Sequence, residues 1–229
     1  MRAEKVRVRE TNEKVDPLRN VILIYLLLLY EYMKITLITA FGDFLQNDCN
    51  SSKEFLKEIS ESNNIHKVIL PVGYFRNDFI KPIKKYSPNK LIFLGMDNSI
   101  KKPKFETIAK NRLVTLKNPL FRFFLMIYVC WLKLNNKNLR IKKEISKKLL
   151  IELPIERNKE QEICLHTIPP KLKEITISND AGNFVCNYSM WVVENYIRHN
   201  KLDTDFYFIH LPLKLNNKQK QELIRFIFK

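Results

Sequence analysis

Short apolar runs and amphipathic segments alternate along most of the chain. Apolar runs rich in β-branched and aromatic residues predict strands at residues 35–39, 66–72, 90–94 and 206–209. Apolar residues at helical spacing predict helices at residues 51–60, 78–86 and 187–199. Strands that alternate with helices in this way favour a three-layer α/β/α fold with a mainly parallel central sheet. The 229 residues, 45% of them hydrophobic, suit a single domain of this kind.

A polar, glycine-containing loop leads into the third of the predicted helices. Residues 178–187 read SNDAGNFVCN, and the apolar spacing that follows places Cys186 on the first turn of the helix. The positive end of the helix dipole favours the nucleophilic thiolate there, and unpaired backbone N–H groups could hold an oxyanion. A buried structural cysteine is the commoner alternative.

A histidine ends the last predicted strand. His210 follows residues 206–209 and precedes a turn that is stiffened by Pro212. An imidazole so placed could serve as a catalytic base, although a single histidine is more often structural or exposed to solvent. Taken together, Cys186 and His210 suggest a Cys–His pair.

These two segments carry a family resemblance. SNDAGNFVCN at 178–187 and FIHLP at 208–212 resemble the pyroglutamyl-peptidase I (pyrrolidone-carboxylate peptidase) family of cysteine peptidases. Weaker similarity lies at residues 38–44, before Asn50 and Ser51, and at residues 105–111. The resemblance implies that the chain removes an N-terminal pyroglutamyl residue from peptides and needs no cofactor or metal.

The same resemblance implies a catalytic triad of Glu106, Cys186 and His210. Glu106 would orient the imidazole of His210, and catalysis would pass through an acyl-enzyme at Cys186. Without the resemblance, Glu106 is a surface acid beside a lysine-rich loop, and nothing else in the sequence would select it.

A substrate pocket is implied by the first of the weaker segments. Phe41 and Phe44 would form apolar walls around the flat, uncharged pyrrolidone ring, and Asn50 would brace the loop between them by hydrogen bonding. An alternative interpretation is that both phenylalanines are ordinary apolar plugs beneath a loop.

The chain departs from the family pattern at several positions near these motifs. Met96 stands where the family has a glutamine, and Leu116 where it has an arginine, although Arg112 and Lys117 lie close in sequence. Residues 168–177 are too few for the helix that the family has there. These changes bear on substrate affinity, rate and specificity more than on the fold.

Two apolar segments lie outside the pattern described so far. The resemblance begins at Met33, so we expect residues 1–32 to be an upstream extension and residues 33–229 to form the pyroglutamyl-peptidase-like domain. The ten apolar residues at 21–30 are too few to span a bilayer, but a signal anchor or a packed tail remains an alternative. The apolar run at 120–134 fits a buried element, or a surface patch used in homo-oligomerisation.

Composition adds two expectations about location and partners. The four cysteines show no CxxC pair and the four histidines no metal constellation, which indicates free thiols in a reducing, cytoplasmic setting. The net charge of +16 would attract nucleic acid, yet no nucleic-acid-binding motif is present, so we expect no specific nucleic-acid partner. The alternative function is that of a non-catalytic or specificity-altered relative that binds a partner or RNA through its basic surface.

Overall fold

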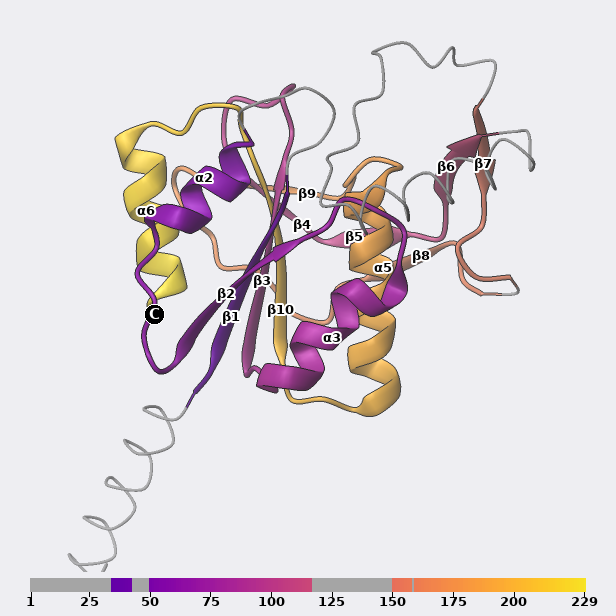
Figure 1. Cartoon of the computed structure of the whole chain (residues 1–229). Coiled ribbons are helices and arrows are strands. Elements are labelled where there is room, and N and C mark those ends of the chain that lie inside the picture. Colours follow the sequence, from indigo (N-terminus) through magenta and orange to yellow (C-terminus); the bar gives the residue numbers. More distant parts are fainter. Residues whose placement is uncertain (1–33, 43–49, 117–149, 158) are drawn as a thin grey trace, which may run out of the picture. The chain divides into compact units, whose positions relative to one another are not determined.

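The computed structural model describes residues 34–42, 50–116, 150–157 and 159–229 (Figure 1). The extension at 1–32, Phe44 and the apolar run at 120–134 lie outside the described residues, so the expectations about them stay predictions. Residues Ile35–Lys229 form one compact unit. In the described ranges, no helix combines the length and the apolar content needed to cross a bilayer.

A mixed, mainly parallel sheet forms the centre of the fold (Figure 1). Its six strands, in spatial order, are β2 (Ile65–Leu70), β1 (Thr36–Phe41), β3 (Lys90–Met96), β10 (Asp205–Leu211), β4 (Lys104–Glu106) and β9 (Thr176–Ser178). The first four strands run parallel to one another. β4 runs antiparallel to β10 and parallel to β9, so the strand direction reverses between β10 and β4.

Within the described ranges, four helices cover the two faces of this sheet (Figure 1). The helices α2 (Ser51–Glu58) and α6 (Asn217–Ile227) pack on one face, and α3 (Arg76–Tyr86) and α5 (Val185–Asn200) pack on the other. The N-terminus of α6 is fixed by a capping box between Asn216 and Gln219, which satisfies two otherwise unpaired backbone N–H groups. The predicted three-layer α/β/α fold is therefore confirmed.

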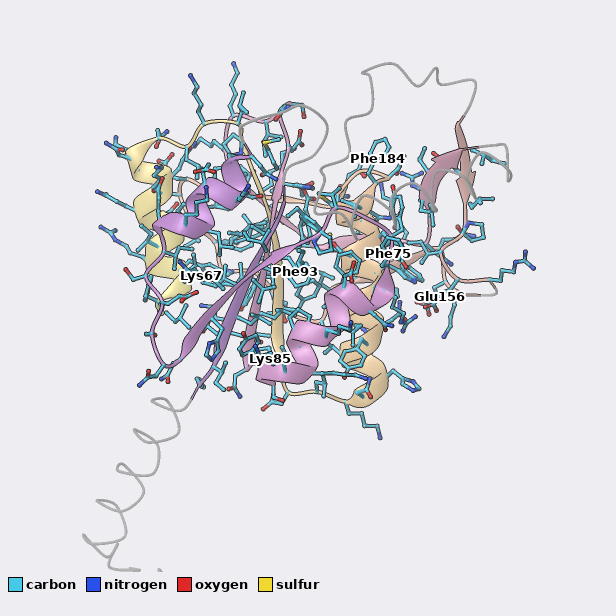
Figure 2. All side chains as sticks on the ribbon, viewed as in Figure 1. Lys67, Phe75, Lys85, Phe93, Glu156 and Phe184 are labelled. Atoms are coloured by element: carbon cyan, nitrogen blue, oxygen red, sulfur yellow. The ribbon has the colours of Figure 1, made fainter. Side chains whose placement is uncertain are left out.

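The side-chain alternation of β10 divides its residues between the two layers. Phe206 and Phe208 pack toward α3 and α5, whereas Ile209 and Leu211 pack toward α2 and α6. On the α5 side, Phe93 meets Phe206 edge to face at 5.5 Å, and Figure 2 shows Phe93 in the interior. Such pairs add about 0.5–1.5 kcal/mol beyond the area that they bury. Because strand side chains repeat every two residues, the residue after Ile209 lies on the α5 face.

β10 is longer than the sequence predicted. The prediction ended the strand at residue 209, but the strand continues through His210 to Leu211. Backbone pairing explains the difference, because His210 is flanked by Gly95 of β3 on one side and by Lys104 of β4 on the other. The histidine is thus held inside the sheet instead of following its end.

Two small antiparallel sheets of two strands each lie outside the central sheet. β5 (Ile108–Lys110) pairs with β8 (Glu162–Cys164), and β6 (Leu113–Leu116) pairs with β7 (Leu150–Leu153). Residues 168–177 contain no helix, as their shortness predicted, and their last two residues begin β9. This segment is tied to α6 by Glu222, whose carboxylate accepts hydrogen bonds from the backbone N–H groups of Lys173 and Glu174.

Candidate active site

Cys186 lies at the N-terminus of α5. The helix begins at Val185, so the cysteine is its second residue. Cys186 therefore lies on the first turn, as the spacing of apolar residues predicted. The preceding loop passes through Gly182, whose φ of +76° is one that glycine adopts without strain. The carboxylate of Asp180 accepts a hydrogen bond from the Gly182 N–H at 3.2 Å and pairs with the Lys110 ammonium group at 2.9 Å. These contacts fix the loop that precedes Cys186.

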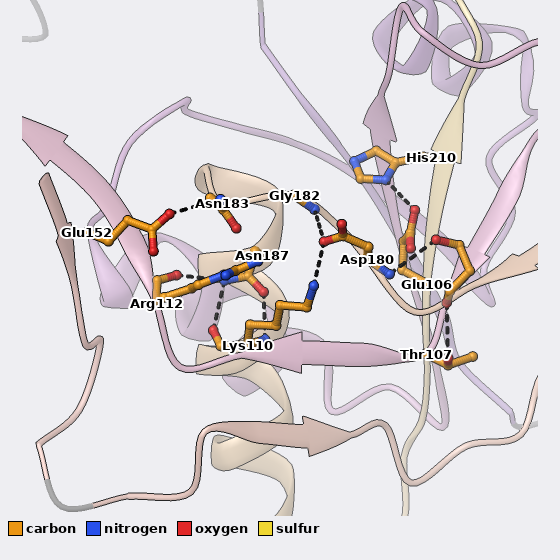
Figure 3. Close-up of polar contacts among 11 residues, drawn as sticks. Glu106, Thr107, Lys110, Arg112, Glu152, Asp180, Gly182, Asn183, Asn187 and His210 are labelled. Atoms are coloured by element: carbon orange, nitrogen blue, oxygen red, sulfur yellow. Dashed lines mark hydrogen bonds and ion pairs between the residues drawn. The ribbon is translucent and has the colours of Figure 1, made fainter. Parts of the chain in front are cut away.

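The residue after the cysteine anchors the start of α5 (Figure 3). The side chain of Asn187 is fully buried and donates hydrogen bonds to the carbonyl oxygens of Lys110 and Arg112, both at 2.8 Å. Its Oδ1 accepts a hydrogen bond from the Lys110 N–H at 2.7 Å. Three bonds from one side chain therefore fix the first turn of the helix against residues 110–112.

His210 and Glu106 form a buried pair (Figure 3). Glu106 lies opposite Phe208 in the antiparallel pairing of β4 with β10, so its side chain shares a face with that of His210. The His210 Nδ1 and the Glu106 Oε1 are 2.8 Å apart, and the two residues are 5% and 2% exposed. The other carboxylate oxygen, Oε2, has no hydrogen-bond partner in the described structure. The pairing leaves the Nε2 of the imidazole to face the other way.

Cys186 and His210 meet above Gly95. A Cβ atom placed on Gly95 would lie 3.1 Å from the Cys186 Sγ, 3.1 Å from the His210 Nε2 and 2.8 Å from the His210 Cδ2. The first two distances are tighter than normal contacts and the third is a clash, so glycine leaves the space in which the thiol and the imidazole approach each other. Cys186 acts on the imidazole through its charge and through a side-chain hydrogen bond. The arrangement is thus a chain from Cys186 through His210 to Glu106.

The charge state of His210 follows from these neighbours. Burial acts to lower the pKa of His210, but the charge and hydrogen bond of Cys186, with those of Glu106, raise it to about 10. The imidazole beside the thiol is therefore protonated at neutral pH, which is the state that complements a thiolate.

The charges of Cys186 and His210 also affect the pKa of two further ionisable side chains. Burial acts to raise the pKa of Asp97, but hydrogen bonds from Ser99 and the charge of His210 lower it below its usual value. Burial raises the pKa of Tyr74 to about 12, and the charge of Cys186 contributes to the rise. The sequence does not predict either residue, because neither lies in the segments that carry the resemblance to the catalytic motifs.

The predicted pocket residues are only partly described. Phe41 is 4% exposed and packs against Phe79 and Phe208, with ring centroids 6.3 and 6.5 Å apart. Asn50 donates hydrogen bonds to the carbonyl oxygens of Phe41 and Gly42, both at 2.9 Å, whereas residues 43–49 of the loop that it was expected to brace lie outside the described residues. Phe44 lies outside the described residues. The pocket and the binding roles of these three residues therefore stay predictions.

Three kinds of comparison relate the chain to known proteins. A family model described as pyroglutamyl peptidase matches residues 140–221, which include Cys186 and His210. Pyrrolidone-carboxylate peptidase 2 of Caldanaerobacter subterraneus subsp. tengcongensis is 29% identical over 194 residues, which are 79% of this chain and 81% of the relative. A pyrrolidone-carboxylate peptidase of Thermoanaerobacter sp. is also 29% identical, over 79% of this chain and 82% of its own.

Solved structures agree with the sequence comparisons in fold. Pyrrolidone carboxyl peptidase from Thermococcus litoralis has a TM-score of 0.54 and 20% identity, and the match covers 82% of this chain and 79% of that one. Pyroglutamyl peptidase I of Bacillus amyloliquefaciens has a TM-score of 0.53 at 20% identity, covering 78% of this chain and 82% of that one. The comparisons point to the pyroglutamyl-peptidase I family. They confirm the family resemblance of residues 178–187 and 208–212, and they support a cysteine peptidase.

The two positions that depart from the pyroglutamyl-peptidase I pattern lie in different strands, β3 and β6. Met96 ends β3 directly after Gly95, and a thioether cannot donate a hydrogen bond. Leu116 lies in β6. Arg112 acts electrostatically on Asp180, whose pKa is lowered chiefly by its hydrogen bond from Lys110. The guanidinium Nε of Arg112 is buried and has no hydrogen-bond partner in the described part of the chain.

Proposed function

We propose that this protein is a cysteine omega-peptidase that hydrolyses the N-terminal pyroglutamyl residue from peptides. Its family and its relatives, which are named pyrrolidone-carboxylate peptidases, indicate pyroglutamyl-peptidase activity. The observation that carries the proposed mechanism is the approach of the Cys186 Sγ and the His210 Nε2 above Gly95, with Glu106 bonded to the far side of the imidazole.

The first half of the proposed reaction forms an acyl-enzyme. The thiolate of Cys186 attacks the carbonyl carbon between pyroglutamate and the next residue, and the carbonyl electrons move onto the oxygen. The backbone N–H of Cys186, at the unpaired start of α5, donates a hydrogen bond to this oxyanion. His210 then gives its Nε2 proton to the leaving amine as the carbon–nitrogen bond breaks. Because the pKa of His210 is about 10, the imidazole keeps this proton at neutral pH until it is transferred to the leaving amine.

The second half releases pyroglutamate. His210, now neutral, removes a proton from a water molecule that attacks the thioester, and the Cys186 thiolate leaves. Glu106 accepts a hydrogen bond from Nδ1 throughout, so it fixes the tautomer of the imidazole and stabilises its charged form. Glu106 thus acts through His210 and does not itself touch the substrate.

Selectivity for a blocked N-terminus would come from an apolar pocket around Phe41 and Phe44. A pyrrolidone ring is flat and uncharged, so aromatic contacts and a few hydrogen bonds suffice to bind it. A free, charged N-terminal amine would lose its hydration in such a pocket without compensation. Asn50 supports this arrangement by holding the backbone of Phe41 and Gly42.

The proposal is tested with a pyroglutamyl-fluorophore conjugate. The wild type should release the fluorophore, and Cys186→Ser should nearly abolish release because a hydroxyl at its normal pKa is a far weaker nucleophile than a thiolate. Cys164, the other described free cysteine, is exposed and provides the matched control, since Cys164→Ser should retain full activity. Undiminished turnover by Cys186→Ser would refute the mechanism.

The alternative is a non-catalytic or specificity-altered relative that binds RNA or a partner through its basic surface. The comparisons do not favour it, because the relatives are named as peptidases. It would gain support from a wild type that is inert toward pyroglutamyl conjugates and binds RNA selectively at physiological salt, where a merely electrostatic attraction fades.

A further inference from the structure

Asp97 lies at the carboxyl end of β3, directly beyond the place where the thiol and the imidazole meet. β3 pairs with β10 so that Gly95 lies opposite His210 (Figure 1). The N–H of Asp97 donates a hydrogen bond to the Leu211 carbonyl oxygen at 2.9 Å, so the pairing of the two strands continues to this residue. Side chains two residues apart on a strand point to the same face, so Asp97 shares its face with the space above Gly95.

The distance along the strand decides which part of a substrate Asp97 can contact. Two residues of an extended strand span about 6.5–7 Å. Gly95 lies beneath the thiol and the imidazole, so Asp97 is too far along β3 to touch the atoms that react there. One residue of an extended peptide spans about 3.3–3.6 Å, and a long side chain reaches further. The residue next to the scissile bond can therefore bring its side chain to the Asp97 carboxylate.

The buried end of the site lies in the opposite direction along the strands. Phe208, two residues before His210, has its ring 5.1 Å from the imidazole, and Phe41 packs against Phe208 at 6.5 Å. In the proposed function, the apolar surroundings of Phe41 take the pyroglutamyl ring, which is the terminal group of the substrate. The peptide that follows the ring must then leave past the carboxyl ends of the strands, which is where Asp97 lies.

The carboxylate of Asp97 is charged and available to a ligand. Burial acts to raise its pKa, but hydrogen bonds from Ser99 and the charges of His210 and Lys104 lower it below its usual value. The N–H and the Oγ of Ser99 both donate to the carboxylate oxygen Oδ1, at 2.9 and 2.6 Å, so they fix the side chain while Oδ2 can accept from a ligand. Asp97 is half-buried and has no ion-pair partner among the described residues. An unpaired carboxylate in a chain of net charge +16 favours a cation at this place.

We propose that Asp97 binds the cationic side chain of a lysine or arginine that follows pyroglutamate in the substrate. The inference rests on the proposed function and names the class of peptides that the site prefers. The cation donates a hydrogen bond to Oδ2 both in the bound substrate and in the transition state, so Asp97 strengthens binding without taking part in proton transfer. Asp97 is thus a specificity-determining residue at the leaving side of the scissile bond.

The test compares two peptides that differ only in this charge. Pyroglutamyl-arginine amide and pyroglutamyl-citrulline amide have side chains of nearly the same shape, but citrulline is neutral. Cleavage of either peptide frees an amine, which is measured with an amine-reactive dye at low ionic strength. The wild type should have a KM about fivefold lower for the arginine peptide with kcat within about twofold, because a partly exposed ion pair contributes little more and acts on binding.

Asp97→Asn should bring the ratio of the two KM values to about one. Asp205→Asn provides the matched control, because Asp205 is exposed and begins β10 at the other end of the same sheet. It removes the same charge from the protein as a whole, so the preference for the arginine peptide should survive in this variant.

Three results would overturn the inference while leaving the proposed function intact. A wild type that cleaves both peptides with equal KM has no such preference, and an Asp97→Asn variant that keeps the preference assigns it to another residue. An equal fall of kcat on both peptides in Asp97→Asn assigns the carboxylate to the imidazole instead of the substrate. A wild type that is inert toward both peptides and toward a pyroglutamyl-fluorophore conjugate contradicts the proposed function itself, and it is recognised before any variant is compared.

Discussion

Replacing Gly95 by alanine tests the geometry of the site with a single methyl group. The added Cβ would lie 2.8 Å from the His210 Cδ2 and 3.1 Å from both the Cys186 Sγ and the His210 Nε2. Real Cβ contacts lie at about 3.4–4 Å, so the imidazole must move by roughly half an ångström or more, and β3 and β10 hold the backbone on both sides. Overpacking of this kind costs about 1–3 kcal/mol of stability.

The loss of activity should be larger than the loss of stability suggests. A misplacement of about 1 Å between reacting groups can cost about 10²-fold in rate, which corresponds to about 2.7 kcal/mol of transition-state stabilisation. We expect Gly95→Ala to fold, to melt at a somewhat lower temperature and to lose activity by about that factor. Thermal unfolding followed by circular dichroism, together with fluorophore release, measures the two effects separately.

A second glycine calibrates the stability effect. A Cβ on Gly42 would make only ordinary contacts, 3.5 Å from the Leu70 carbonyl oxygen and 3.7 Å from the Ile69 Cγ2. Gly42→Ala should therefore unfold at nearly the wild-type temperature. Full activity in Gly95→Ala would refute the reasoning, because the thiol and the imidazole could not then need the space above Gly95.

Three further predictions concern charge, packing and the extension. His210 must be protonated to pair with the thiolate and to protonate the leaving amine, so activity should fall as the pH rises through about 10. Glu106→Gln removes an influence that raises the pKa of His210, so this alkaline fall in activity should move to lower pH. An alkaline fall at an unchanged pH would contradict the pairing. Glu194 is fully buried and accepts hydrogen bonds from the backbone N–H of His166 at 3.1 Å and the Nε of Arg198 at 2.6 Å. Glu194→Gln should therefore lower the free energy of unfolding in urea by about 2 kcal/mol with kcat unchanged. An unaltered unfolding midpoint would refute a stabilising role for this carboxylate. A chain that starts at Met33 should unfold at the same temperature as the full chain, whereas early melting or aggregation would make residues 1–32 part of the fold.

The parts of the fold that the sequence predicts well are those with long, regular patterns. The strand around residues 90–94 and the helix that follows Cys186 have enough apolar residues at one period to be recognised. β4 has only three residues, which is too short for any periodicity, and it runs antiparallel to β10. The sequence therefore placed Glu106 in the site through the family resemblance alone.

The contacts that complete the site depend on distant parts of the chain. Glu106 and His210 are 104 residues apart in sequence, and β10 lies between β3 and β4 in the sheet. The sequence around Gly95 does not indicate that a thiol and an imidazole meet above this residue. The bonds of Asn187 to residues 110–112 are likewise invisible until the chain is folded, although the residue stands next to Cys186.

Trapping of the acyl-enzyme tests the central claim most directly. The protein is mixed with an activated pyroglutamyl ester, quenched in acid within the first turnover and digested for mass spectrometry. Our account predicts a pyroglutamyl adduct on the peptide that contains Cys186, with none on the peptide that contains Cys164 and none at all in a Cys186→Ala variant. Rapid turnover of the ester by Cys186→Ala, or an adduct on a residue other than Cys186, would contradict it.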